Sequence, residues 1–191
     1  MDEMSEHELP GSTRGRLLVA TPPLDDPNFD RTVVYMLEHN PEGAVGVVLN
    51  RPSDDTLPDA LDRWQDQLTS PQVLFDGGPV ELDALIALAR LDGEPGDAWS
   101  SVVGDLGSID LGLDPAIITE RVVELRVFRG YSGWGPGQLD HELGEGAWMV
   151  LPSERNDVFS PAPDDLWRTV IRRQGGRIAW IANAPDDLST N

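Results

Sequence analysis

The stretch FRGYSGWGPGQLDHELGEGAW, residues 128–148, says most about how this chain folds. It places four glycines and two large aromatic residues within the eight positions 130–137, directly after a run rich in β-forming residues. Glycine permits positive φ and close approach of two backbones, and proline suits the first turn of a helix. The sequence therefore predicts a strand over 122–130, a turn over 131–135 and a short helix that begins at Pro136.

Two interpretations of the turn remain open. In the first, backbone amides at the helix N-terminus are unpaired donors for an anion or a carbonyl oxygen, and the aromatic rings form the walls of a pocket. In the second, the glycines only make a tight corner and the rings fill the core. The first interpretation makes the following residues candidates for ligand binding: Tyr131, Trp134, Gly135, Gly137 and Gln138.

The same stretch departs from patterns that would indicate catalysis or a cofactor. G-Y-S-G-W differs from the nucleophile elbow G-x-S-x-G because Trp134 stands where the second glycine is needed. The dinucleotide pattern G-x-G-x-x-G would need a glycine where the chain has Gln138. We therefore predict no catalytic residue and no cofactor.

Length and composition indicate one compact domain. A chain of 191 residues suits a single core that buries roughly 70% of the unfolded surface. We expect one domain over 14–191 and a flexible acidic tail over 1–13. No apolar run approaches about 18 residues, so no membrane span is expected. The N-terminus also lacks the basic start and apolar centre of a signal peptide, and we expect a cytoplasmic protein.

The charged residues exclude several classes of site. The chain has no cysteine, and all its 14 basic residues are arginine. Disulfides, thiolate metal sites, Walker A loops and Schiff-base chemistry are therefore excluded. The net charge of −20 opposes nucleic-acid binding, which depends on neutralising phosphates. One basic patch is a candidate exception: Arg168, Arg172, Arg173 and Arg177.

That patch has a simpler explanation. Asp164 and Asp165 precede the arginines, and Gly175 follows them, so the charges match the dipole of a helix over 164–174. Direct nucleic-acid binding is therefore not expected.

Hydrophobic patterning predicts the other elements. Residues 22–30, 92–99 and 104–114 read as loop or irregular structure, and 82–91 fits either a strand or a helix. The predicted strands span 15–21, 31–39, 44–51, 72–80, 100–104, 147–152 and 177–182, and the further helices span 56–68 and 115–121. The second and third strands form an antiparallel hairpin around 40–43. Several adjacent strands with scattered helices indicate an α+β fold with a mixed sheet.

Two local groups of side chains contain both histidine and carboxylates: Glu38-His39 and Asp140-His141-Glu142. Neighbours in sequence point apart on a strand or a helix, so each group offers few ligands and we predict no metal site. Glu38 and His39 stay candidates for acid–base chemistry in an enzymatic alternative.

Three segments together resemble the AlgH/YqgE family of bacterial proteins: LLVATPPLDDPNFDRTVVYMLEHNPEGAVGVVLNRP (17–52), VLFDGGPV (73–80) and FRGYSGWGPGQLDHEL (128–143). They follow in the family's order and cover most of the chain from Arg16 to Pro152. The resemblance implies a single α+β domain with a mixed, branched sheet partly closed into a small barrel and surrounded by helices. It also favours a strand over 82–91. Family members commonly have alanine where this chain has Ser132, and often a histidine where it has Ala89.

The motifs supply further candidate ligand-binding residues: Asn28, Arg31, His39, Asn50, Arg51, Gly77 and Gly78. Gly77 and Gly78 fit a corner of the sheet as well as a binding loop. If the segments 26–31, 50–52, 77–79 and 130–138 converge on one cleft, a site is favoured. If they scatter, they are corners of the fold.

Members of the family are often labelled transcriptional regulators. The leading hypothesis is a non-catalytic cytoplasmic regulatory protein that binds a small anionic or polar ligand, or a protein partner. The alternatives are a direct DNA-binding transcriptional regulator, and a hydrolase-like enzyme that uses His39 and Glu38 near the 133–138 loop.

Overall fold

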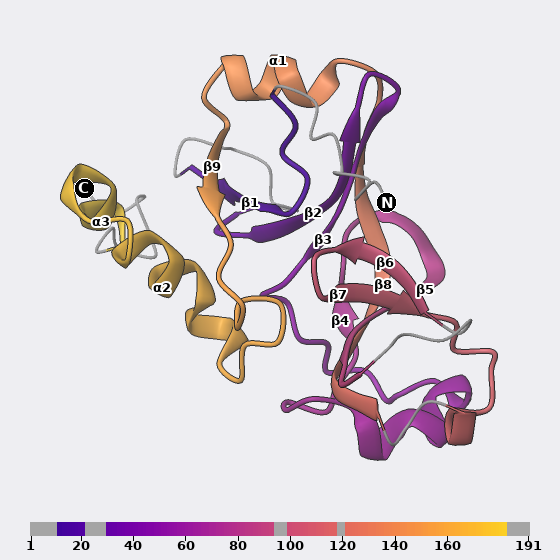
Figure 1. The fold of residues 1–191 in the computed structure, drawn as a ribbon. Coiled ribbons are helices and arrows are strands. Elements are labelled where there is room, and N and C mark those ends of the chain that lie inside the picture. The colour runs from indigo at the N-terminus through magenta and orange to yellow at the C-terminus, as the bar shows by residue number, and fades with distance from the viewer. Residues whose placement is uncertain (1–10, 22–29, 94–98, 118–120, 183–191) are drawn as a thin grey trace.

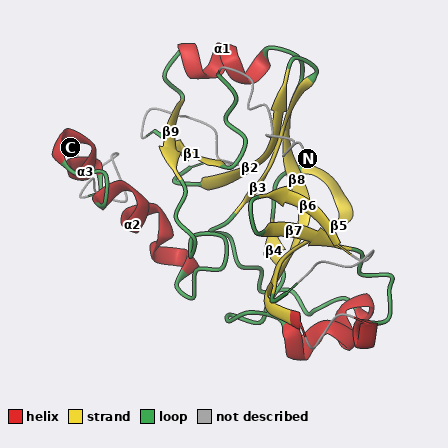
Figure 2. Ribbon diagram, viewed as in Figure 1, coloured by secondary structure: helices red, strands yellow, loops and turns green. Residues whose placement is uncertain are grey.

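A computed structural model describes residues 11–21, 30–93, 99–117 and 121–182 (Figure 1). Nine strands form one curled sheet in the order β6-β7-β5-β8-β3-β2-β1-β9, and β4 branches from this path by pairing with β8 (Figure 2). The β4–β8 pair is parallel, and the other pairs are antiparallel. The predicted α+β domain with a mixed, branched sheet is therefore confirmed. Within the described ranges, no helix is long and apolar enough to span a membrane.

The strands are β1 (Arg16–Ala20), β2 (Val33–Asn40), β3 (Gly43–Val48), β4 (Phe75–Asp76), β5 (Val80–Leu91), β6 (Trp99–Val103), β7 (Leu106–Ile109), β8 (Val122–Trp134) and β9 (Trp148–Pro152). The helices are η1 (Asp59–Gln67), η2 (Pro115–Ile117), α1 (Gln138–Gly144), η4 (Pro163–Asp165), α2 (Leu166–Arg172) and α3 (Gly176–Ile181). The η segments are 3₁₀ helices.

β1 after Arg16, β2 as far as Leu37 and β3 are almost entirely apolar because both faces of their part of the sheet are buried. Leu17 and Val19 belong to the core cluster that also contains α2, whereas Leu18 and Ala20 belong to the cluster that contains Trp134 and α1. Successive side chains of a strand point to opposite faces, so an uninterrupted apolar run serves two cores at once.

Strand β8 joins the two halves of the curled sheet. The change of partner occurs where Gly130 of β8 meets two glycines of the turn between β4 and β5. The early residues of β8 pair with β5, and its last residues pair with β3. Gly130 has φ 64°, and a Cβ there would lie 2.6 Å from the carbonyl oxygen of Gly78. A Cβ at Gly77 would collide in turn with the Gly130 carbonyl oxygen. We call Gly77, Gly78 and Gly130 the glycine crossing.

Backbone hydrogen bonds fix the glycine crossing in place. The Gly77 amide donates to Arg129 O at 2.8 Å, and the Val48 amide donates to Gly77 O at 2.9 Å. Ser132 Oγ donates to the same carbonyl oxygen at 3.2 Å. β3, β8 and the chain after β4 are therefore tied together at one peptide group.

The predicted turn over 131–135 is wrong, because β8 continues to Trp134. Residues 132–134 find a partner in β3, where Ala44 pairs with Trp134 and Gly46 with Ser132. Gly130 bends the strand without ending it. The expected strand over 72–80 is only the two-residue β4, after which Gly77 and Gly78 turn the chain into β5. The strand alternative for 82–91 is confirmed.

The predicted final strand over 177–182 is wrong, since residues 177–181 lie in α3 and Ala182 is its C-cap. Ile178 and Ala182 both contact the main core cluster, and a spacing of four places them on one face of a helix. Gly175 and Gly176 have positive φ and set the new chain direction after α2. The helix over 164–174 is confirmed as η4 and α2.

Two smaller expectations also change. Residues 106–109 of the segment expected to be irregular form β7, whose partners are β5 and β6. The helix expected over 56–68 is the shorter 3₁₀ helix η1, which begins at Asp59, after Pro58. Ser12 and Thr13 contact His39, and the domain boundary expected at residue 14 stays a prediction. The prediction of a tail falls otherwise on residues 1–10, outside the described residues.

Arg126 is a buried cation that joins distant segments. Its side chain is 1% exposed and donates hydrogen bonds to the carbonyl oxygens of Val158 at 3.0 Å, Ser70 at 2.9 Å and Ser160 at 3.1 Å. Its guanidinium lies 4.2 Å from the centre of the Phe75 ring. Burial lowers the pKa of Arg126 to about 10, so the side chain remains a cation at neutral pH. Carbonyl dipoles and an aromatic face stabilise that charge.

The glycine crossing makes a prediction about stability. Gly130 and Gly137 have similar φ values of 64° and 70°, but only Gly130 is crowded, because nothing lies within 4 Å of a Cβ at Gly137. We expect Gly137→Ala to lower the free energy of unfolding by about 1 kcal/mol, from φ strain alone. We expect Gly130→Ala to cost roughly 3 kcal/mol or more, because backbone atoms must also move. Urea denaturation measures both, and equal losses would contradict the crowding.

Candidate functional site

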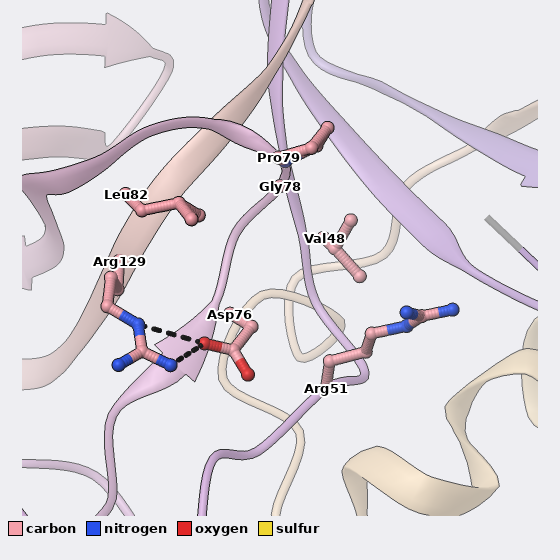
Figure 3. A pocket seen from close by; sticks show the side chains of 7 residues that line it. All are labelled: Val48, Arg51, Asp76, Gly78, Pro79, Leu82 and Arg129. Carbon is pink, nitrogen blue, oxygen red and sulfur yellow. Dashed lines mark hydrogen bonds and ion pairs between the residues drawn. The ribbon is translucent and has the colours of Figure 1, made fainter. Parts of the chain in front are cut away.

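A cleft of about 340 Å³ opens beside the glycine crossing (Figure 3). β4, β5 and β8 contribute to it, as do the end of β3 and the residues that follow it. It is lined by Val48, Arg51, Asp76, Gly78, Pro79, Leu82 and Arg129. The lining combines apolar walls with arginine and carboxylate side chains, a mixture that suits a small polar ligand.

Arg129 lies at the centre of an ion-pair network. Its Nε and Nη2 donate to Asp76 Oδ1 at 3.1 and 2.7 Å, and its Nη1 donates to Asp55 Oδ2 at 2.7 Å. The hydrogen bonds that Arg129 donates to Asp55 and Asp76 raise the pKa of Arg129 above its usual range. Two carboxylates therefore hold one guanidinium, and they fix its plane across the wall of the cleft.

Arg51 supplies a second cation. Its Nη2 donates to the carbonyl oxygen of Asp30 at 3.3 Å, and within the described part of the chain no carboxylate forms an ion pair with it. Figure 3 shows its guanidinium pointing away from the Arg129–Asp76 pair. Among the residues that the structure describes, no acid matches the charge of this cleft arginine.

Asn50 positions the rim of the cleft. Its Nδ2 donates to Arg31 O at 2.9 Å, and its Oδ1 accepts from the Val33 amide at 2.9 Å. Arg31 has φ 50°, uncommon for a residue other than glycine, and its guanidinium lies 5.2 Å from the centre of the Trp167 ring. Neither Asn50 nor Arg31 lines the cleft. Their contribution is to hold the backbone beside it, through the hydrogen bonds that Asn50 makes with Arg31 and Val33.

Two of the four predicted segments, 50–52 and 77–79, contribute lining residues to this cleft. Arg51, Gly78 and Pro79 line it, and Asp30 bonds Arg51 at its edge. From the stretch 130–138, Gly130 and Tyr131 lie against Gly78 through their backbones. The segments 50–52 and 77–79 therefore meet at one concave surface, whereas the described residues of 26–31 and 130–138 do not line it. Asn28 lies outside the described residues.

The remainder of the opening stretch, 133–138, does not contribute to this cleft. The Gly135 amide donates to Gln138 Oε1 at 3.1 Å, and the Gln138 amide donates to Gly135 O at 3.1 Å. The expectation of unpaired amides is therefore wrong at these two positions. The Gln138 side chain folds back onto the turn and takes the place expected for a ligand. Gly137 has a left-handed conformation immediately before α1.

Trp134 fills the core. Its ring packs edge-to-face against Trp148 with the ring centres 6.0 Å apart, and both indole Nε1 atoms donate to Glu142 Oε2, at 2.9 and 2.8 Å. Gln138 Nε2 donates to the other oxygen of Glu142 at 3.0 Å. One carboxylate of α1 therefore joins the end of β8 to the start of β9.

His39 lies away from the cleft, at the far end of the β2–β3 hairpin. The ring is 8% exposed, and its Nδ1 accepts from the Thr13 amide at 3.2 Å. Its Nε2 lies 3.6 Å from Asp140 Oδ1. Glu38 Oε1 accepts from the His39 amide at 3.1 Å. These contacts connect the first residues of the domain and α1 to the hairpin.

Sequence reasoning did not select Asp55, Asp76 or Arg129 as site residues. Asp76 and Arg129 nevertheless carry a readable signal, since each is a charged residue between an apolar strand and a glycine, in F-D-G-G and F-R-G. Such a residue lies where a strand meets a sharp bend and points into the space that the bend opens. Asp55 carries no comparable local signal.

Comparison with known proteins gives one consistent family. Residues 17–179 match the family described as AlgH-like. A UPF0301 protein of Streptomyces avermitilis is 50% identical over 186 residues, which covers 94% of this chain and 96% of the relative. A UPF0301 protein of Thermobifida fusca is 44% identical over 190 residues, with coverage of 94% and 96%.

Two solved structures resemble the fold over nearly the whole chain. A crystal structure of a protein from Corynebacterium diphtheriae has a TM-score of 0.82 and 29% identity, and the match covers 95% of this chain and 94% of that one. The solution structure of the AlgH protein from Pseudomonas aeruginosa has a TM-score of 0.70 and 28% identity, with coverage of 98% and 100%.

The ion-pair network predicts a small effect of Arg129 on stability. Arg129→Met should lower the free energy of unfolding by about 1 kcal/mol, because its side chain and its two partners are partly exposed. The loss should shrink as salt rises. Arg63→Met, at an exposed site in η1, should change it by less than about 0.5 kcal/mol. A loss at Arg129 that salt leaves unchanged would indicate a role in packing instead.

The indole–carboxylate cluster predicts a larger effect. Glu142→Ala should lower the free energy of unfolding by about 2–3 kcal/mol, because it deprives two buried indole N–H groups of their common acceptor. Glu145→Ala, on the exposed end of the same helix, should stay within about 0.5 kcal/mol of the parent chain. Thermal or urea unfolding compares the two, and similar small losses would show that the indoles do not depend on Glu142.

Proposed function

The chain belongs to the AlgH-like family, and on that premise we propose that it is a non-catalytic, cytoplasmic regulatory protein that binds a small anionic ligand in the cleft beside the glycine crossing. The observation that carries the proposal is convergence. Segments from N-R-P, F-D-G-G-P and F-R-G, far apart in sequence, meet at one concave surface.

The charges of the cleft support an anionic group on the ligand. Asp55 and Asp76 already balance much of the Arg129 charge, so an anion gains most from Arg51. Hydrogen bonds from a guanidinium to an anion are among the stronger ones that proteins make. The apolar part of a ligand would lie against Val48 and Leu82. An acidic side chain of a protein partner would offer the same chemistry.

The alternatives have less support. For direct DNA binding, Arg173 would have to leave Asp157 and Glu154, to which its guanidinium is bound at 2.6 and 3.3 Å. For a hydrolase, His39 would have to give up its contact with Thr13, and it does not line the cleft. Both roles require side chains, Arg173 and His39, that already form contacts within the fold.

The proposal is tested with named anions and one pair of variants. Inorganic phosphate, AMP and citrate are titrated into ¹⁵N-labelled protein, and we expect at least one to shift the amide signals of Arg51, Gly77, Gly78 and Arg129. Arg51→Met should weaken that binding about tenfold to hundredfold, the effect of losing a charge-assisted hydrogen bond. Arg63→Met, at an exposed site elsewhere, should bind as the parent chain does. Silence from all three anions, or full binding by Arg51→Met, would contradict the proposal.

A further inference from the structure

A second pocket, of about 250 Å³, lies apart from the first cleft and shares no lining residue with it. Its walls come from the start of β1, from β2 and β5, from the β6–β7 turn and from the segment after β9. The sequence reasoning selected none of its side chains. Two of them, Tyr35 and Arg90, are at least nine-tenths buried and still have donor atoms available.

Tyr35 presents a hydroxyl that is unpaired within the described ranges. The residue is 5% exposed, and no described residue forms a hydrogen bond with its Oη. Buried polar groups normally find partners, so this one is an exception that requires an explanation. The Oη atom is not sealed from solvent. Because Tyr35 lines the pocket, this accessible surface of Oη is available to a ligand there. Burial raises the pKa of Tyr35 to about 12, so the hydroxyl keeps its proton and can donate.

Arg90 presents a second donor. Its Nε donates to Asp105 Oδ1 at 3.1 Å, and its Nη1 donates to Glu124 Oε2 at 2.7 Å. The pairing with Glu124 follows from the sheet register, in which Arg90 lies directly opposite that residue. Its guanidinium also lies 5.0 Å from the centre of the Phe159 ring. These contacts fix the plane of the group and leave Nη2 without a partner among the described residues.

The neighbouring charged residues limit the charge of a ligand that the Tyr35 and Arg90 donors can bind. Asp105 and Glu124 balance Arg90, and Arg155 pairs with Asp105 at the rim. Glu154, also in the lining, is paired with Arg173. A group with two negative charges would therefore meet no spare cation. A single carboxylate with its charge spread over two oxygens matches one hydroxyl and one guanidinium N–H.

We propose that this pocket binds a small monocarboxylate that accepts hydrogen bonds from Tyr35 Oη and Arg90 Nη2. The apolar part of the ligand lies against Val103, Leu106 and Val158. The site explains why a buried hydroxyl and a rigid guanidinium N–H are left unpaired at the surface of one pocket. It does not depend on the cleft of Arg51.

Benzoate is the test probe, and benzamide is its uncharged match in shape. The chain has two tyrosines, so protein labelled at tyrosine Cζ gives two ¹³C signals, which Tyr35→Phe assigns. Benzoate should shift the Tyr35 signal and leave that of Tyr131 in place, and benzamide should bind at least tenfold more weakly. No shift at Tyr35, or equal binding of benzamide, would overturn the proposal.

Variants separate this site from the first. Tyr35→Phe should weaken benzoate binding about tenfold to hundredfold. Its melting temperature should equal or exceed that of the parent chain, since the hydroxyl removed has no partner to lose. Arg51→Met should bind benzoate as the parent chain does, because Arg51 is not in the lining. Unchanged benzoate binding by Tyr35→Phe, or its loss in Arg51→Met, would refute this assignment.

Discussion

The close approach of two backbones at Gly77, Gly78 and Gly130 is the constraint on which the rest of the structure depends. A strand that pairs with β5 on one stretch and with β3 on the next must bend between them, and the bend occurs where β8 passes under the turn that begins β5. No side chain fits between these backbones. The same bend brings Arg129 to Asp76 and opens the cleft beside them. The candidate site is thus a consequence of how the sheet changes partners.

Much of the glycine- and aromatic-rich stretch 128–148 serves to stabilise the fold. Gln138 caps its own turn, and Glu142 gathers the indole groups of Trp134 and Trp148. These interactions close the chain between β8 and β9 and require the same residues that a binding loop would use. Glycine turns, aromatic rings and amides at a helix start are therefore ambiguous from sequence, because corners and sites need the same local geometry.

The arginines within the strands differ in whether they stabilise the fold or line a possible binding site. Arg126 is wholly buried, its two terminal nitrogens donate to carbonyl oxygens and its sealed Nε has no partner among the described residues, so it serves the fold. Arg90 is almost as buried, but one of its donors beside a pocket has no partner in the described part of the chain, and Arg129 is fixed by acids at the wall of a cleft. The three arginines differ in whether a guanidinium N–H group is available at a pocket once the contacts within the protein are made. An N–H group available at a pocket indicates a binding role more reliably than burial of the side chain does.

The sequence by itself determined the strands β1 to β3, the hairpin between β2 and β3, the short helix after Pro136 and membership of the family. Each of these depends on neighbouring residues, through apolar runs, turn formers or motif order. Only the tertiary structure decided that residues 177–181 are helical, that β8 continues to Trp134, and that Arg129 meets partners 53 and 74 residues away. Those outcomes depend on which strand edge or core surface is available in three dimensions, and local sequence carries no record of it.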